Sequence, residues 1–134
     1  MNLIVCVDDR NGMMFNGRRL SRDRVLREYL LELSGGKLWM NSYSAGQFES
    51  TENLVVRENF LGETPEGEFC FLEDQPCPDC EDRLEQVILC KWNRTYPSDR
   101  KFDLPLGEHG WHCVSRKEVP GSSHDRITVE VYKR

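Results

Sequence analysis

The chain of 134 residues has the usual size of one domain, so we expect a single domain over residues 1–134 with one hydrophobic core. Hydrophobic residues make up 38% and charged residues 31%, a globular balance that excludes an intrinsically disordered protein. The net charge of −5 argues against nucleic acid or an anionic membrane as partner, because either would need a basic face.

The N-terminal sequence MNLIVCVDD lacks a basic leader and soon turns acidic, so we expect no secretory signal. No apolar run approaches the length that crosses a membrane. Cys6, Cys70 and Cys90 lie in apolar runs, which is typical of buried free thiols. We therefore expect a cytoplasmic protein.

The first third of the chain has the pattern of a β-α-β unit. An apolar strand is expected over residues 2–9 and a loop over residues 10–17, which hold two Asn-Gly pairs that favour positive φ. Ser21 is a good N-cap for a helix whose apolar residues recur at helical spacing and which Ser34-Gly35-Gly36 ends. A second strand over residues 37–41 follows directly, as in a parallel sheet.

The rest of the chain is rich in predicted strands. A helical turn is expected within residues 77–86, after the sequence CPDC. The last two strands alternate polar and apolar residues, as an antiparallel hairpin does. The pattern predicts an α/β fold with a mixed, mostly parallel sheet, a C-terminal antiparallel hairpin and flanking helices. The predicted strands of this part cover residues 53–56, 68–73, 87–93, 110–119 and 127–134.

Cys77 and Cys80 form a CxxC sequence, which can be half of a zinc site or a redox pair. A zinc site would need two further ligands. The best donors are His109, His112 and Cys113, and the conceivable set takes His112 and Cys113. Neighbours in a strand point to opposite faces, so the two cannot easily bind one ion. A small zinc-binding domain and a plain turn with two cysteines stay open as alternatives, and we predict no metal.

Common catalytic and phosphate-binding motifs are missing from the sequence. There is no GxSxG, GxGxxG or Walker pattern. No spacing places a nucleophile beside a base, so His109, His112 and His124 are interpreted as surface or strand histidines.

Several segments, taken in chain order, resemble the dihydrofolate reductase family. LIVCVDDRNGMMFNG is similar to its opening strand and N-G-x-G-x-N-G loop, and Leu20-Ser-Arg-Asp23 is similar to the L-P-x-D entry to its first long helix. KLWMN is similar to its next strand. SDRKFDLP is similar to D-T-x-F-P, and the last two strands are similar to its closing hairpin. The resemblance covers most of the chain and implies that family's fold.

The resemblance also implies a site. Asp23 would be the catalytic acid of a pterin pocket, where enclosure by apolar groups would raise its pKa, and the protein, if an enzyme, would be an oxidoreductase. Ile4, Cys6, Arg27 and Cys90 would contact the substrate. Arg27, one helical turn after Asp23, could instead pair with it and neutralise its role.

The chain departs from the family at the cofactor side. Asn41-Ser-Tyr-Ser44 stands where the family has the Gly-Arg-x-Thr that holds the NADPH phosphate, and Glu73-Asp74 stands where a Gly-Gly pair approaches the pyrophosphate. Two carboxylates would repel that group. Cys90 replaces a threonine that hydrogen-bonds the acid. We therefore expect standard NADPH binding to be lost.

Two functions follow. The first is a divergent dihydrofolate reductase-like protein with a pocket for a small flat, pterin-like ligand. The second is a non-enzymatic protein-binding or regulatory module on the same fold, with a protein partner or a second copy. Exposure of Trp39, Trp92 or Trp111 would favour the second.

Overall fold

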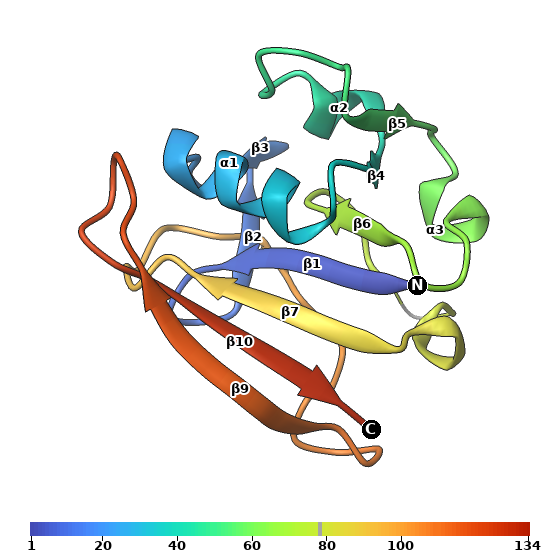
Figure 1. Cartoon of the computed structure of the whole chain (residues 1–134). Helices are drawn as coiled ribbons and strands as arrows, with labels where there is room; N and C mark the ends of the chain where they lie inside the picture. The colour runs from blue at the N-terminus through green and yellow to red at the C-terminus, as the bar shows by residue number, and fades with distance from the viewer. Residues whose placement is uncertain (78) are drawn as a thin grey trace.

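A computed structural model describes residues 1–77 and 79–134. The described residues form a seven-stranded sheet in the order β5-β4-β6-β1-β7-β10-β9 (Figure 1). Its strands, in chain order, are β1 (Asn2–Val7), β4 (Leu38–Met40), β5 (Leu54–Val56), β6 (Phe69–Leu72), β7 (Gln86–Lys91), β9 (His112–Val119) and β10 (Ile127–Lys133).

β1 lies at the centre of this sheet. It pairs in parallel with β6 on one side and β7 on the other, and β4 and β5 continue the parallel part. β10 runs antiparallel to β7 and β9 antiparallel to β10. The predicted mixed sheet with a closing hairpin is confirmed. The central parallel strands β1 and β7 are apolar except at their ends, because both faces of the sheet are covered.

The helix α1 (Arg24–Leu33) covers one face of the sheet (Figure 1). Its buried residues, Leu26 and Leu30, pack in one cluster with Ile4 of β1 and Ile88 of β7. The helix begins two residues later than predicted, because Asp23 and not Ser21 is its N-cap. The end of the helix agrees with the sequence, since Ser34 is the C-cap and Gly35 has a φ of +71°.

The opposite face of the sheet packs against loops and short elements. Its cluster joins alternate residues of β1, such as Leu3 and Val5, to Phe102, Leu104 and Trp111 of the chain between β7 and β9. The remaining short elements are α2 (Ser42–Ala45), α3 (Phe60–Glu63) and the 3-10 turn η1 (Glu81–Arg83).

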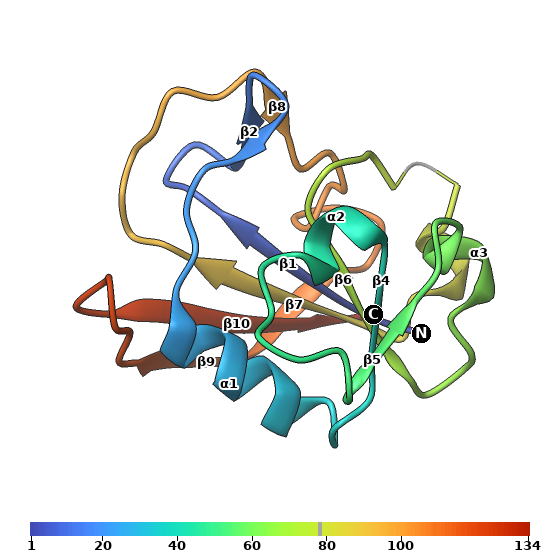
Figure 2. The same ribbon diagram turned by 90° about the horizontal axis from the view of Figure 1, so that it is seen from above.

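A second, three-stranded sheet corrects the prediction of a loop over residues 10–17. β2 (Gly12–Phe15) pairs with β3 (Arg18–Arg19) and with β8 (Arg100–Lys101). The Asn-Gly pairs still mark its turns, since Asn11 and Asn16 have positive φ. The chain after β7 loops out to meet β2 (Figure 2).

The longest helix, α1, has ten residues. In the part of the chain that the structure describes, no helix has the length and apolar character that a membrane crossing needs.

Candidate functional site

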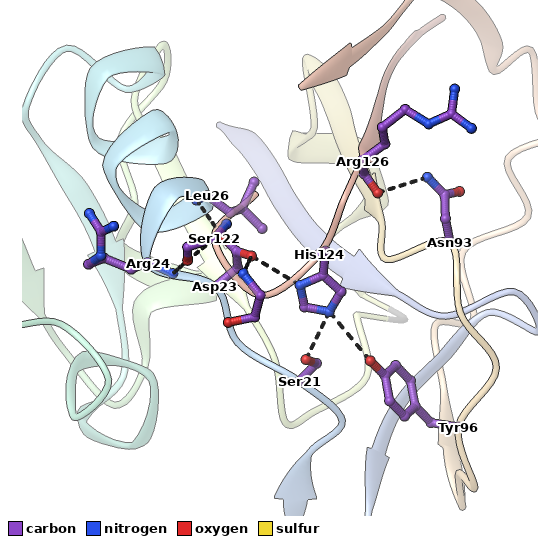
Figure 3. Close-up of polar contacts among 10 residues, drawn as sticks. Ser21, Asp23, Arg24, Leu26, Asn93, Tyr96, Ser122, His124 and Arg126 are labelled. Atoms are coloured by element: carbon purple, nitrogen blue, oxygen red, sulfur yellow. Dashed lines mark hydrogen bonds and ion pairs between the residues drawn. The ribbon is translucent and has the colours of Figure 1, made fainter. Parts of the chain in front are cut away.

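Asp23 lies at the N-terminus of α1, where its side chain is almost completely buried, with 1% of the residue exposed. Oδ1 accepts hydrogen bonds from the backbone N–H of Leu26 and of Ser122, both at 3.0 Å, and from Oγ of Ser122 at 3.2 Å. Oδ2 accepts from the backbone N–H of Ser123 at 2.8 Å and from Nδ1 of His124 at 3.0 Å (Figure 3). Five donors therefore saturate one carboxylate.

These donors decide the charge of Asp23. Burial alone raises the pKa of this carboxyl, but the hydrogen bonds from the Ser122 backbone, His124, Leu26 and Ser123 outweigh burial and hold the pKa well below its usual range. The expectation of a raised pKa is wrong, because the enclosing groups are N–H donors and not apolar side chains. Asp23 is ionised at neutral pH.

The donors other than Leu26 come from the loop between β9 and β10, about a hundred residues away in sequence. A Cβ at Gly121 would lie 2.5 Å from Oδ2 of Asp23 and 2.8 Å from the backbone oxygen of His124. The loop therefore seals the carboxylate only because residue 121 has no side chain.

His124 is buried, with 4% exposed, which corrects its interpretation as a surface or strand histidine. Its ring stacks on Trp92, with centroids 4.6 Å apart and planes at 24°. Nε2 faces two hydroxyls, Oγ of Ser21 at 3.1 Å and the Tyr96 oxygen at 3.4 Å (Figure 3). No sequence pattern connects these residues, since they meet only when the hairpin folds over α1.

The other predicted site residues are placed in two different surroundings. Ile4, Cys6 and Cys90 lie on the sheet face beneath α1, where Cys6 and Cys90 are register partners of adjacent strands. The hydrogen bond with Cys90, together with burial, raises the pKa of Cys6.

Arg27 lies on α1, and its backbone N–H, not its guanidinium, donates to the backbone oxygen of Asp23. Among the described residues no ion pair joins these two side chains, so the proposed neutralising pair does not form.

Two adjoining cavities lie between α1 and residues 46–53. The larger, of about 550 Å³, includes Ser122 and Ser123 in its wall, so the loop that seals Asp23 also separates it from this cavity. The smaller, of about 180 Å³, adds the apolar side chain of Leu31. Both are lined by Arg24, Arg27, Phe48 and Glu49, and neither is lined by Ile4, Cys6 or Cys90. We call the two cavities together the α1 cleft.

The α1 cleft is cationic at one end. Arg22, Arg24 and Arg27 line the larger cavity against one acid, Glu49. Arg24 pairs with Glu28 at 3.0 Å, whereas the guanidinium groups of Arg22 and Arg27 form no ion pair with any described residue. Nearby, Gln47 also lines the cavity, and it has a buried amide.

Gln47 is 8% exposed, and its Nε2 finds no hydrogen-bond partner in the described part of the chain. A buried donor without a partner costs about 1–3 kcal/mol. Gln47 also lines the larger cavity.

The region where the resemblance places NADPH does not fit a pyrophosphate. Glu73, which follows β6, is buried and bonds Nε of Arg19 at 3.0 Å and Nη2 at 3.3 Å. Asp74 accepts from Nδ2 of Asn41 at 2.9 Å, and Asn41 also caps α2. The arginine that could attract a phosphate is thus occupied, and two carboxylates stand at the strand end.

Cys77 and Cys80 are joined as a disulfide. Within residues 1–77 and 79–134, no three His, Cys, Asp or Glu side chains gather as a metal site. The other proposed zinc ligands lie on β9, where the Cys113 thiol bonds the backbone oxygen of Ser115 and His112 bonds that of Gly110.

The tryptophans do not provide an exposed aromatic patch. Trp92 and Trp111 are buried, and Trp39 is half-buried with its indole N–H on Glu68 at 2.8 Å. The burial of Trp92 and Trp111 gives no support to the alternative of a protein-binding module, and Trp39 is partly accessible.

The mixed sheet with α1 on one face and a closing hairpin defines an α/β protein of a recognisable class. No protein-family model and no curated protein sequence matches the chain. A search of solved structures matches dihydrofolate reductase from Enterococcus faecalis, complexed with NADP(H) and RAB-propyl, with a TM-score of 0.70. The match covers 99% of this chain and 95% of that one at 10% identity, so this chain has a dihydrofolate reductase-like fold.

Proposed function

We propose that the protein binds a small molecule in the α1 cleft, a ligand with a flat apolar part and an anionic group, and that it does so without NADPH. The observation that carries the proposal is the position of Arg22 and Arg27, which form no ion pair with any described residue, in a cavity that adjoins a smaller one where Leu31 and Phe48 lie. Ligand pockets on known folds combine an apolar lining with a few placed polar groups in this way.

The chemistry of the α1 cleft supports this ligand class. A guanidinium matches a carboxylate or phosphate with two parallel hydrogen bonds, and the buried amide of Gln47 adds a donor. Phe48 and Leu31 in the smaller cavity suit an aromatic ring. The dihydrofolate reductase-like fold is consistent with a small-molecule ligand, and the solved relative is a complex with one.

The hydrogen bonds on Asp23 limit which groups of a ligand this carboxylate can contact. With five donors already on its carboxylate, Asp23 has no free acceptor for the ring of a pterin. The ligand therefore lies beside the loop of residues 121–124 and not on the acid. An aromatic dicarboxylate without a pterin ring suffices for this cleft.

Isothermal titration calorimetry with p-aminobenzoyl-glutamate, methotrexate and NADPH tests the proposal. We expect saturable binding of p-aminobenzoyl-glutamate and of methotrexate, and none of NADPH. Arg27→Ala should weaken binding about tenfold or more, since a charge-assisted hydrogen bond contributes about 1.5–3 kcal/mol. Lys133→Ala, which removes an exposed cation at the far end of β10, is the matched control and should bind normally.

The outcomes separate the parts of the proposal. Equal binding by the Arg27→Ala and wild-type proteins would place the ligand elsewhere. Saturable NADPH binding would contradict the proposal that the protein works without NADPH, and would favour a reductase. No heat signal from any of the aromatic carboxylates would remove the proposal altogether.

A further inference from the structure

Ser21, His124 and Asp23 form a chain of hydrogen bonds at the loop between β9 and β10. Oγ of Ser21 lies 3.1 Å from Nε2 of His124, and Nδ1 of the same ring lies 3.0 Å from Oδ2 of Asp23 (Figure 3). A hydroxyl, an imidazole and a carboxylate are thus joined in series through both ring nitrogens. This is the arrangement that activates a serine hydroxyl as a nucleophile, and such an arrangement is recognised by geometry and not by sequence order.

The surroundings give each of the three groups a definite role. The carboxylate of Asp23 is ionised and can only accept, so Nδ1 of His124 carries a proton toward it. Whenever the ring carries only this proton, Nε2 has a free electron pair, and the hydroxyls of Ser21 at 3.1 Å and Tyr96 at 3.4 Å face it, Ser21 the nearer. The ring cannot turn away, because Trp92 stacks on it and Asp23 holds its other edge.

The three groups differ in their exposure to solvent. The side chains of His124 and Asp23 are 2% and 0% exposed, whereas Ser21 is only partly buried. The next residue, Arg22, lines the larger cavity of the α1 cleft. Its guanidinium forms no ion pair with any described residue, so it is available to an anionic substrate.

We propose that Ser21 is a nucleophile activated by His124, with Asp23 as the positioning residue, and that the protein hydrolyses small carboxylic esters that bear an anionic group. The assignment of Ser21 depends on the Ser21–His124–Asp23 geometry alone, whereas the anionic group of the ester rests on Arg22 and so on the function proposed for the α1 cleft. It assigns Asp23 a different role from the acid of a pterin pocket.

Hydrolysis of the ester by Ser21 and His124 needs water and no cofactor. Oγ of Ser21 bonds to the ester carbonyl carbon while its proton passes to Nε2 of His124. The carbon–oxygen bond of the leaving alcohol breaks, and the alcohol takes that proton. Water then attacks the acyl-serine through the same base, which releases the carboxylic acid and restores the hydroxyl.

Labelling with a fluorophosphonate probe, followed by peptide mass spectrometry, tests the assignment directly. We expect stoichiometric phosphonylation of Ser21 in the wild-type protein. His124→Gln, which keeps a donor for Asp23 but removes the base, should label at least about a hundredfold more slowly. Hydrolysis of mono-4-nitrophenyl succinate should fall by a similar factor in Ser21→Ala and in His124→Gln.

Ser115→Ala is the matched control, because Ser115 is an exposed serine on β9 away from the three residues. It should label and hydrolyse like the wild type. Ser21→Ala should fold normally, since among the described residues the hydroxyl bonds only His124. This variant keeps the test valid if His124→Gln unfolds.

A purely structural network would give a different result. Absence of label on Ser21 of the folded wild-type protein would overturn the proposal. Hydrolysis that persists in Ser21→Ala, or labelling of Ser21 that His124→Gln does not slow, would overturn it equally.

Discussion

Nδ1 of His124 lies 3.0 Å from Oδ2 of Asp23, across 101 residues of sequence and with both side chains buried. The contact ties the hairpin loop between β9 and β10 to the N-terminus of α1. A buried carboxylate is stable only when its oxygens are paired, and this loop supplies four of the five donors. The same acid therefore caps a helix, anchors a loop and orients an imidazole.

Asp23→Asn should lower the free energy of unfolding at pH 7 by about 2 kcal/mol or more, because the amide cannot accept every donor that the carboxylate satisfies. The pKa of Asp23 is lower in the folded state than in the unfolded state, where it is about 4. The ionised carboxylate therefore stabilises the fold at pH values above about 4, and this stabilisation is lost as the pH falls toward the folded-state pKa. The difference between variant and wild type in urea unfolding should shrink at about pH 3.

Asp103→Asn, at an exposed aspartate, is the control for this prediction and should change stability little at either pH. A variant at position 23 as stable as the wild type at neutral pH would show that the loop does not depend on the carboxylate.

Gly121→Ala should destabilise the protein by about 1–3 kcal/mol, since the new methyl group would lie 2.5 Å from Oδ2 of Asp23. Gly107→Ala places its methyl group in open space and should change stability by less than about 0.5 kcal/mol. Chemical denaturation of both variants measures the difference. Equal stabilities would mean that the loop can shift without cost.

Gln47→Met should stabilise the free protein by about 1 kcal/mol, because it removes a buried donor without a partner among the described residues. If that donor serves the ligand, the same change should weaken binding of p-aminobenzoyl-glutamate. Thermal unfolding and calorimetry on one preparation measure both effects. Gln75→Met, at a half-buried glutamine remote from the α1 cleft, should affect neither. A variant that is more stable and binds normally would separate Gln47 from the ligand.

Native-state alkylation with iodoacetamide should modify Cys113 first, because its thiol is exposed on β9. Cys70 should react last among the free thiols, since it is buried and burial raises its pKa to about 12. Peptide mapping by mass spectrometry at successive times gives the order. In guanidinium chloride Cys70 and Cys113 should react at similar rates. Fast native modification of Cys70 would contradict the packing between β6 and the loops.

The strands of the seven-stranded sheet were predictable from local signals, but their order in the sheet was not. Apolar runs such as residues 87–93 became parallel strands covered on both faces, and the alternation in residues 127–134 became the closing hairpin. The Asn-Gly pairs located tight turns, but the pairing of β2 with β8 was missed because such short strands have no periodicity of their own. The helix start was misplaced by two residues, since Ser21 and Asp23 are both good caps and tertiary contacts chose between them.

By itself, therefore, the sequence determined an α/β sheet of dihydrofolate reductase type, an acid at the start of its first helix and two carboxylates, Glu73 and Asp74, directly after β6. Only the tertiary structure decided the state of that acid. A local sequence predicts which residue begins a helix, because capping is a short-range effect. Whether the carboxylate faces a ligand or His124 depends on a loop about a hundred residues away, whose position follows from strand pairing and packing.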